Sequence, residues 1–445
     1  EELAMRGEED QGVGAAPSSR GFLVIAGQQL FGTILAFVVW VLLARMLPVS
    51  KFGEFNAAFG VAMMAGTLAN LGMAQYVTVP FRSAISTGDF QAARGLRRVV
   101  PWCIFGAAMI VYGLIVPAHV MLSDVSIVRD ETFAGILVLL PLVGIMLYLV
   151  STANVHGAPG PAMFLSVPGL QILIGVGLGA AWLIRGERFD VLDAAVVWVT
   201  AMTVICFALW LLNLSVEAAD FKSGFGTLAW RSWASGTLPF FLNGTVCVFL
   251  VQAPFLVLGW IQPSGRDAAM FAAADRLAQL LAVAGLAGGA MFLPLIADAV
   301  RAQDYRYCQR LVRRWILLVG TTNLVGLVLL GFFGVYLLDL YGGEYRAAYP
   351  LLLVSGASIG FAMTASVFLS IVQYDGGGIW VIRTSLAWSV IGAGAMLVLG
   401  WKWQAMGVAV GQGGAFVGMS IAFALKARPF LSGATSPGGR IGLDE

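Results

Sequence analysis

Two adjacent charged residues, Asp275 and Arg276, are the residues of this sequence best suited to chemistry, because they stand inside the otherwise apolar stretch FAAADRLAQLL. Arginine offers a planar fork of N–H donors that can bind two phosphate oxygens, and it keeps its charge at physiological pH. Adjacent helix residues point about 100° apart, so Asp275 is expected to pair with another helix, orient a basic group or take up a coupling proton. For both residues, an ion pair that only fixes helix packing is the alternative.

Further polar residues lie in apolar runs and are candidates for a polar path through the protein. Asn56, Thr67 and Asn70 are separated by 11 and 3 residues, which places them within about 60° on a helix. Other polar residues extend this set: Gln28, Gln29, Asn243, Gln252, Gln279 and Asn323. Each of them could instead form a hydrogen bond between packed helices.

The composition places these residues in a membrane protein. Hydrophobic residues make up 59% of the chain and charged residues 11%, with a mean hydropathy of +0.86, whereas soluble domains contain about 25% charged residues. A formal net charge of +2 predicts no nucleic-acid partner. The spacing of Cys and His predicts no metal site, and no GxxxxGK[ST] phosphate loop is present, so we expect no cofactor. Energy would then come from an ion gradient, the membrane potential or a downstream reaction.

Apolar runs long enough to cross a bilayer divide the chain into about twelve predicted spans. A helix needs about 20 apolar residues to cross a hydrocarbon core of about 30 Å. The runs cover residues 22–44, 55–80, 99–122, 132–152, 162–184, 193–214, 233–260, 268–297, 315–338, 348–373, 379–399 and 405–425. Most of the 13 tryptophans, including Trp40, Trp315 and Trp401, fall near the ends of these runs, as in an interfacial aromatic belt. The predicted fold is an all-α polytopic membrane protein.

The distribution of Lys and Arg predicts the orientation. An even number of spans puts both termini on one side of the membrane. Of the 26 basic residues, sixteen then lie on that side and eight on the other, while Arg276 and Arg383 lie within spans. Since basic loops stay inside, we expect both termini in the cytoplasm. The first apolar run lacks the basic flank and cleavage site of a signal peptide and is predicted to be a retained span.

An internal repeat divides the spans into two lobes. Matching landmarks recur at offsets of 214 or 215 residues, namely Pro48 with Pro263, Pro80 with Pro294, Asp89 with Asp304 and Arg98 with Arg313. Six spans per half give a parallel repeat about an axis along the membrane normal, as in secondary transporters. The predicted organisation is a cytoplasmic tail (1–20), a six-helix lobe (21–214), a cytoplasmic linker (215–232), a second six-helix lobe (233–425) and a second cytoplasmic tail (426–445).

Two stretches resemble a known superfamily of exporters. The run LLARMLPVSKFGEFNAAFGVAMMAGTLANLGMAQYV (42–77) resembles the polysaccharide flippase family of the multidrug/oligosaccharidyl-lipid/polysaccharide exporter superfamily. The run 271–304 is similar to the lipid II flippase branch, in which an Ala-Asp-Arg-Leu motif carries an essential arginine, and this motif matches residues 274–277. Lipid II flippases typically have about two further C-terminal helices, whereas this sequence ends after the twelfth predicted span. That difference favours the polysaccharide-unit branch.

This resemblance implies an exporter of polyprenyl-diphosphate-linked oligosaccharides in the bacterial cytoplasmic (inner) membrane, working by alternating access in the synthesis of lipopolysaccharide or exopolysaccharide. The implied partners are the lipid-linked oligosaccharide, membrane lipids, a coupling proton or cation, and other polysaccharide assembly proteins. Two alternatives stay open. One is a multidrug antiporter of the same superfamily, which would need a cation-binding carboxylate in its lumen. The other is a glycan polymerase or ligase, which normally needs a large outer loop, whereas the predicted outer loops have about 5 to 10 residues.

Overall fold

The structure of the protein, a computed structural model, describes residues 19–121, 130–217, 226–227, 230–261 and 265–432. These residues form helices and short connections without a β-strand. The first half comprises α2 (Ser19–Met46), α3 (Val49–Ala69), α4 (Met73–Tyr76), α5 (Thr78–Thr87), α6 (Gln91–Met121), α7 (Asp130–Leu137), α8 (Leu139–Val155), α9 (Pro159–Phe164), η3 (Leu165–Gly169), α10 (Leu170–Arg185), η4 (Gly186–Arg188) and α11 (Val191–Val216). The second half comprises α13 (Trp230–Ile261), α14 (Arg266–Ala278), η5 (Gln279–Leu281), α15 (Ala282–Arg301), α16 (Tyr305–Trp315), η6 (Ile316–Gly320), α17 (Thr321–Asp339), η7 (Gly343–Ala348), α18 (Tyr349–Tyr374) and α19 (Gly378–Leu431). The all-helical prediction is confirmed.

The helices of the described residues account for the predicted twelve spans. Nine are long and apolar enough to cross a membrane, and two bent pairs, with bends of 48° and 44°, bring the number to eleven. The 54-residue α19 holds two predicted spans, because Gln404 has non-helical angles (φ 54°, ψ −135°) and kinks it in the middle. Counting its two parts separately gives twelve.

The two parts of α19 fold back on each other through glycines. A Cβ atom placed on Gly407 would lie 2.0 Å from the carbonyl oxygen of Leu399, and one on Gly411 would lie 2.7 Å from the backbone nitrogen of Met396. Side chains at these positions would keep the two backbones apart. The glycine spacing therefore allows a tight helical hairpin, in line with the role of small residues in membrane helix packing.

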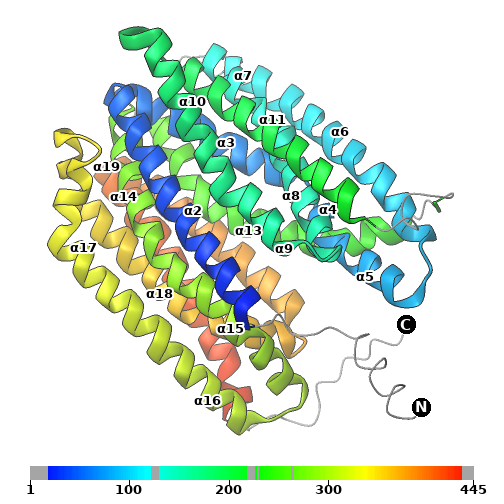
Figure 1. Ribbon diagram of the computed structural model, residues 1–445. Helices are drawn as coiled ribbons and strands as arrows, with labels where there is room; N and C mark the ends of the chain where they lie inside the picture. The colour runs from blue at the N-terminus through cyan, green and yellow to red at the C-terminus, as the bar shows by residue number, and fades with distance from the viewer. Residues whose placement is uncertain (1–18, 122–129, 218–225, 228–229, 262–264, 433–445) are drawn as a thin grey trace, which may run out of the picture.

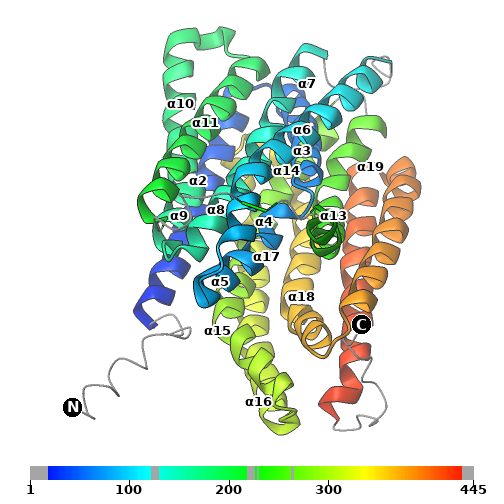
Figure 2. The same cartoon turned by 90° about the vertical axis from the view of Figure 1, so that its right-hand side faces the viewer.

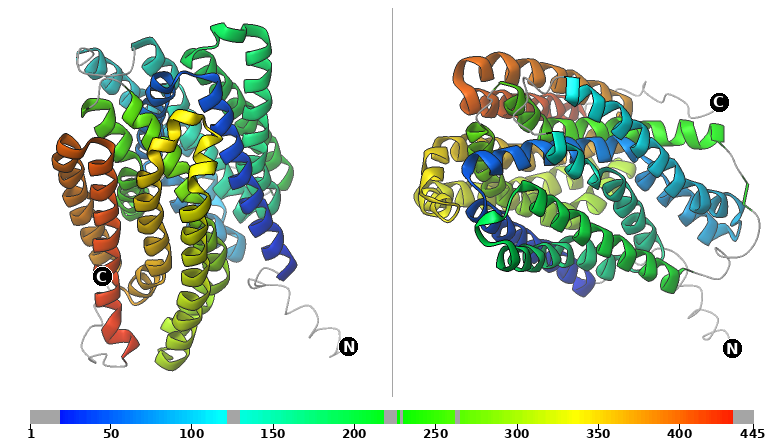
Figure 3. Two further views of the ribbon diagram at one scale, coloured as in Figure 1. Left: turned by 90° about the vertical axis from the view of Figure 1, so that its left-hand side faces the viewer. Right: turned by 90° about the horizontal axis from the view of Figure 1, so that it is seen from above.

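The helices form two lobes that lie side by side (Figures 1 and 3). The first lobe contains α2 to α11 and the second contains α13 to α19. The start of α2, the turn between α15 and α16 and the end of α19 all lie at one end of the bundle, the lower end in Figure 2. We call the opposite end the upper end. The expected tails 1–20 and 426–445 and the linker 215–232 fall largely outside the described residues, although α19 continues as a helix to Leu431.

At the upper end the lobes are joined by close backbone contact between α3 and α14. A Cβ atom on Gly53 would lie 1.8 Å from the carbonyl oxygen of Gly265, and one on Gly265 (φ 67°) would lie 2.6 Å from the carbonyl oxygen of Ser50. Arg45, at the end of α2, donates to the backbone carbonyl oxygens of Leu340 (2.6 Å) and Asp339 (3.2 Å) in the other lobe. The upper end is thus sealed by contacts between the lobes.

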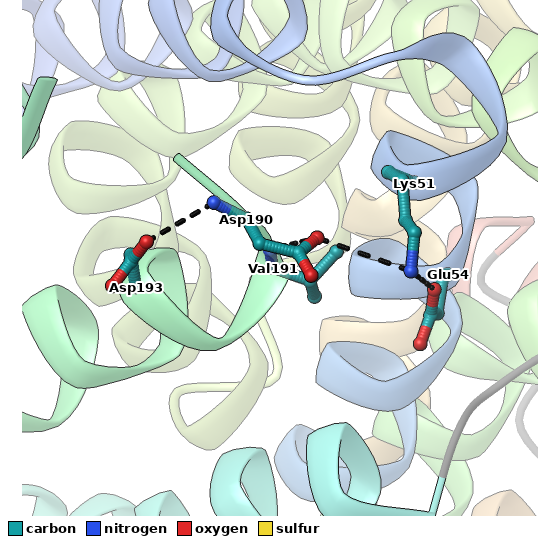
Figure 4. Close-up of polar contacts among 5 residues, drawn as sticks. All are labelled: Lys51, Glu54, Asp190, Val191 and Asp193. Atoms are coloured by element: carbon teal, nitrogen blue, oxygen red, sulfur yellow. Dashed lines mark hydrogen bonds and ion pairs between the residues drawn. The ribbon is translucent and has the colours of Figure 1, made fainter. Parts of the chain in front are cut away.

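Within the first lobe, a small polar network fixes the start of α11 beside α3 (Figure 4). Asp190 and Asp193 form a capping box, in which each carboxylate accepts a backbone N–H from the first turn. Such a box satisfies N–H groups that the helix itself leaves without acceptors. Lys51 lies 2.9 Å from the carboxylate of Glu54 and 3.9 Å from that of Asp190, so it connects the starts of α3 and α11.

Candidate functional site

Arg276 lies near the end of α14 and reaches toward the first lobe. Its guanidinium carbon is 4.4 Å from the ring centre of Trp40 on α2 and 6.0 Å from that of Phe255 on α13. A desolvated arginine over an aromatic face can gain about 2 kcal/mol. Its Nη1 donates to the Gln279 side-chain oxygen at 3.5 Å. Its Nε is buried and has no hydrogen-bond partner among the described residues. The Nη1 group of the guanidinium is therefore hydrogen-bonded, whereas the Nε–H donor is not.

Asp275 is buried and is held by a side chain of its own helix. Gln279, one turn further on, donates from Nε2 to the Asp275 carboxylate at 2.5 Å and accepts from Arg276 through its other end. Among the described residues, no ion pair joins Asp275 to a Lys or Arg. The expected partner on another helix is absent in this part of the chain, and Gln279 orients the arginine and the carboxylate together. It does so where α14 tightens into the 3₁₀ turn η5.

A cavity of about 530 Å³ opens beside these residues, mainly in the second lobe and bounded by α2 of the first. Asp275, Arg276 and Gln279 form one part of its wall. Its other polar lining residues come from four helices, α2, α13, α18 and α19: Gln29, Thr33, Asn243, Gln252, Ser366, Ser385, Gln412 and Ser420. Leu, Ile, Val, Met and Phe side chains complete the wall, so a few polar groups stand in an apolar surround, as in small-molecule sites generally.

The polar groups of this cavity retain hydrogen-bonding capacity. The side-chain oxygen of Gln252 is buried without a partner among the described residues. Gln412 uses its amide to donate to the backbone oxygen of Leu250 at 3.0 Å, which holds α19 against α13. A buried polar atom without a partner costs about 1 to 3 kcal/mol. Gln252 and Arg276 each carry this cost.

Trp40 is the aromatic partner of the cavity residue Arg276, and sequence reasoning missed this role. Together with Phe52, Phe55, Phe59 and Trp198 it forms a set of aromatic rings with centroids 5.0 to 6.4 Å apart. The position of Trp40 near the end of a predicted span indicated an interfacial anchor, but its side chain is buried, with only 6% of the residue exposed. The same prediction is wrong for Trp315, which is 1% exposed and donates to the Thr364 carbonyl at 2.8 Å. Trp401, 80% exposed, fits the prediction.

Four of the predicted site residues do not line this cavity. Asn56 and Thr67 donate to carbonyls of their own helix, those of Phe52 (2.8 Å) and Met63 (3.0 Å). Asn70 donates to Gly144 on α8 and accepts from the backbone of Ala74, so it holds the break between α3 and α4. Gln28 lies on α2, next to Gln29, with its side-chain oxygen buried and without a partner among the described residues. Arg276, Asp275, Gln279 and Asn243 are the predicted site residues that the structure brings together.

Asn323 from the extended polar set serves helix packing. Its amide donates to the Gly360 carbonyl at 3.1 Å and to the Thr364 hydroxyl at 3.2 Å, linking α17 to α18. Within the described ranges, no group of three His, Cys, Asp or Glu side chains could hold a metal ion.

Comparisons with known proteins show the fold. No protein-family model and no curated protein matches this sequence. The chain is similar to an inward-facing multidrug resistance MATE family transporter of the MOP superfamily, with a TM-score of 0.73 and 16% identity over 91% of this chain and 94% of that one. It is also similar to the lipid II flippase MurJ in an inward closed conformation, with a TM-score of 0.69 and 12% identity over 93% of this chain and 90% of that one.

A third similar structure is a MOP superfamily transporter from Pyrococcus furiosus, with a TM-score of 0.65 and 15% identity over 93% of this chain and 96% of that one. The protein thus has the membrane-transporter fold that multidrug transporters and a lipid flippase share. At these identities the similarity shows the fold only. The substrate has to be inferred from the residues of the site.

Proposed function

We propose that this protein is a flippase that moves polyprenyl-diphosphate-linked oligosaccharide units across the bacterial cytoplasmic membrane by alternating access, for the synthesis of cell-surface polysaccharide. The observation that carries the proposal is the state of Arg276. Its guanidinium contacts Trp40 and Gln279, its Nε is buried without a partner among the described residues, and it borders a cavity that has several polar lining groups. A diphosphate supplies the anionic oxygens that such a fork binds.

The cavity also suits the sugar part of the substrate. Each glycan hydroxyl costs about 4 to 8 kcal/mol when it enters a hydrocarbon-like medium without a partner, so the headgroup needs a polar path. Gln252, Gln412 and Asn243 line the cavity and offer amide donors and acceptors from α13 and α19. The headgroup would occupy this cavity, and the polyprenyl chain would remain in the lipid outside.

Asp275 is the group we assign to energy coupling. It is 2% exposed and borders the same cavity as Arg276. Its only described hydrogen-bond donor is the neutral amide of Gln279. Uptake of a proton or a cation there would change the charge beside Arg276 and therefore its affinity for a phosphate. Coupling and substrate binding would then act on the same turn of α14.

A multidrug or cation antiporter is the second candidate, and the likeness to MATE transporters favours it. In that case Asp275 would bind a cationic substrate or a coupling ion directly, and Arg276 would be a packing residue on Trp40. The two candidates differ in whether the arginine is essential. Loss of Arg276 would impair a flippase but not a cation antiporter, whereas loss of Asp275 would impair both.

The test uses the full chain in proteoliposomes loaded with a fluorescent polyprenyl-diphosphate glycan. Arg276→Lys keeps the charge but loses the fork, and one charge-assisted hydrogen bond is worth about 1.5 to 3 kcal/mol, so we expect transport to fall about tenfold or more. Arg276→Ala should abolish transport. Arg383→Ala is the matched control, because this arginine also lies within a predicted span but does not line the cavity.

The amount of folded protein in the membrane is measured in parallel. If Arg276 only holds the lobes together on Trp40, both variants should lose folded protein before any change in specific transport, because truncating one member of a buried pair costs about 3 to 5 kcal/mol. Full glycan transport by Arg276→Ala at normal abundance would disprove the phosphate role. Efflux of a cationic dye that needs Asp275 but not Arg276 would establish the antiporter instead.

A further inference from the structure

The helix α16 is strongly amphipathic and lies at the lower end of the second lobe. Its buried face consists of Cys308, Leu311, Val312 and Trp315. The opposite face carries four exposed arginines, Arg306, Arg310, Arg313 and Arg314, and a fifth exposed arginine, Arg301, precedes the helix. Among the described residues, none of these five forms an ion pair with a carboxylate. The only carboxylate at the helix start, that of Asp304, accepts the backbone N–H of Tyr307 as its N-cap.

A groove of about 620 Å³ runs beside this helix, between η6, α18 and α19. Its walls are apolar and include Ile316, Phe361, Phe368, Ile421 and Leu425. Leu425 is 62% exposed and Ile421 47% exposed, so the groove faces outward from the bundle. An apolar groove on the outer surface of a membrane span is in contact with lipid chains.

The mouth of the groove is polar and basic. It contains Gln309 of α16 together with Arg428 and Ser432 at the end of α19. The side-chain amide of Gln309 donates to the Leu431 carbonyl, which brings the two helices together there, and Figure 2 shows both at the lower end. Arg428 is exposed and has no ion-pair partner among the described residues.

A second arginine, Arg313, shares a helix face with two residues that line the groove. Gln309, Arg313 and Ile316 are separated by four and three residues, and such positions share one face of a helix. Since Gln309 and Ile316 both line the groove, Arg313 lies on the groove side of α16. Arg310 and Arg314 point about 100° or more away from Gln309 on the same helix. Arg428 therefore lies at the open end of the apolar channel, and Arg313 lies on the face of α16 that borders this channel.

We propose that this groove is a binding site for an anionic glycerophospholipid of the leaflet at the lower end. One acyl chain lies along the apolar wall, and the phosphate is bound between Arg313 and Arg428. Basic pockets between membrane helices bind anionic head groups in this way. The proposal does not depend on the transported substrate, because the groove lies outside the cavity of Arg276 and shares with it only the wall residues Ala365 and Ser420.

The bound lipid would hold α16 against the end of α19. The two helices already touch through Gln309 and Leu431, and an anionic phosphate between Arg313 and Arg428 would bridge the two arginines and offset their mutual repulsion. We therefore expect the lipid to raise the thermal stability of the second lobe in addition to being retained on purification.

The test compares phosphatidylglycerol with phosphatidylcholine of the same acyl chains, added to the delipidated full-length protein and counted by native mass spectrometry. Phosphatidylglycerol should bind more tightly, and the double variant Arg313→Gln/Arg428→Gln should lose about thirtyfold in affinity. The matched control is Arg310→Gln/Arg314→Gln, which removes the same net charge from the exposed face of α16 but not from the groove. It should keep wild-type affinity. Since all four arginines are exposed, size-exclusion profiles should be unchanged.

A second arm tests the acyl chain. Ala424 lines the groove and is half-buried, so Ala424→Phe should fill the channel while leaving both arginines in place. It should weaken phosphatidylglycerol binding, and water-soluble glycerol phosphate should fail to compete at equal concentration. Equal retention of both lipids, equal loss in the two double variants, or no effect of Ala424→Phe would each overturn the proposal. So would a polyprenyl diphosphate that occupies the groove in preference to phosphatidylglycerol.

Discussion

Gln279 gives the two adjacent charges of α14 a shared partner. The carboxylate of Asp275 accepts from its amide nitrogen, and the guanidinium of Arg276 donates to its amide oxygen. A neutral side chain can satisfy both because an amide has a donor end and an acceptor end. It holds the arginine without neutralising it, so the positive charge remains available to an anion.

This arrangement predicts that Gln279→Leu destabilises the protein by about 1 to 3 kcal/mol, because it leaves the buried carboxylate without its donor. Thermal unfolding of the purified variant measures the loss. Combining it with Asp275→Asn, which removes the charge, should recover a large part of that loss in a double-mutant cycle. Additive effects of the two substitutions would contradict a direct bond between Gln279 and Asp275.

Single residues also show where sequence reasoning reaches its limit. An ionised residue in an apolar span is expensive, so Arg276 and Asp275 could be singled out without a structure. Helix periodicity groups Asn56, Thr67 and Asn70 on one face but does not say which neighbour that face meets, and the structure gives them backbone carbonyl acceptors or, for Asn70, a link to α8. Trp40 escaped notice because its partner lies 236 positions away on the other lobe, and no local pattern encodes that contact.

At the scale of elements, the hairpins α5–α6 and α15–α16 repeat the same turn. Gly88 (φ 76°) and Gln303 (φ 55°) both adopt the left-handed conformation. Asp89 and Asp304 follow, and each accepts a backbone N–H of the next helix, from Gln91 and Tyr307. The offset of 215 residues found in the sequence therefore corresponds to a repeated local structure. Breaks inside the spans were not predictable in this way, since α3 breaks at Gly72 and α14 at η5.

The repeated turn gives a matched pair of substitutions. Gly88→Ala should lower stability by about 1 to 2 kcal/mol, since an L-residue is strained at positive φ and nothing lies within 4 Å to compensate. Gln303→Gly removes that strain but also removes the bonds of Gln303 to Tyr305 and Val300, so it should change stability by less than about 1 kcal/mol. The midpoint of thermal unfolding in detergent compares the two. An equal loss in both variants would contradict the backbone explanation.

At the scale of the whole molecule, the charge distribution predicts the orientation in the membrane. Cys308 lies in the basic region but is 0% exposed, so it cannot report the side on which it lies. Ala302, in the α15–α16 turn, and Glu187, in η4 at the upper end, are exposed. In a cysteine-free background, Ala302→Cys should resist an impermeant thiol reagent added to intact cells, whereas Glu187→Cys should react. The reverse pattern would place the termini outside.

Under the proposed alternating-access mechanism, the contacts at the sealed upper end must open. Gly53 and Gly265 let α3 and α14 touch through their backbones, and Ser50 and Gly265 are 215 residues apart, the offset of the internal repeat. If the two lobes are related by the predicted pseudo-twofold axis, this contact lies close to it. Arg45 and the stacking of Arg276 on Trp40 add bonds between the lobes. All of these contacts have to separate before the cavity can open at the upper end.

Gly53→Ala should consequently weaken the seal without touching the cavity. Its Cβ atom would lie 1.8 Å from the carbonyl oxygen of Gly265, so the lobes must move apart there. Overpacking of this kind costs about 1 to 3 kcal/mol, which is a shift of roughly 5- to 150-fold toward the conformation open at the upper end. Spin labels at Glu187→Cys and Glu344→Cys, one on each lobe, should show a longer distance population. Gly27→Ala is the control, since nothing lies within 4 Å of its Cβ position. An unchanged distance distribution in Gly53→Ala would mean that the seal depends on Arg45 and the aromatic contacts rather than on this backbone contact.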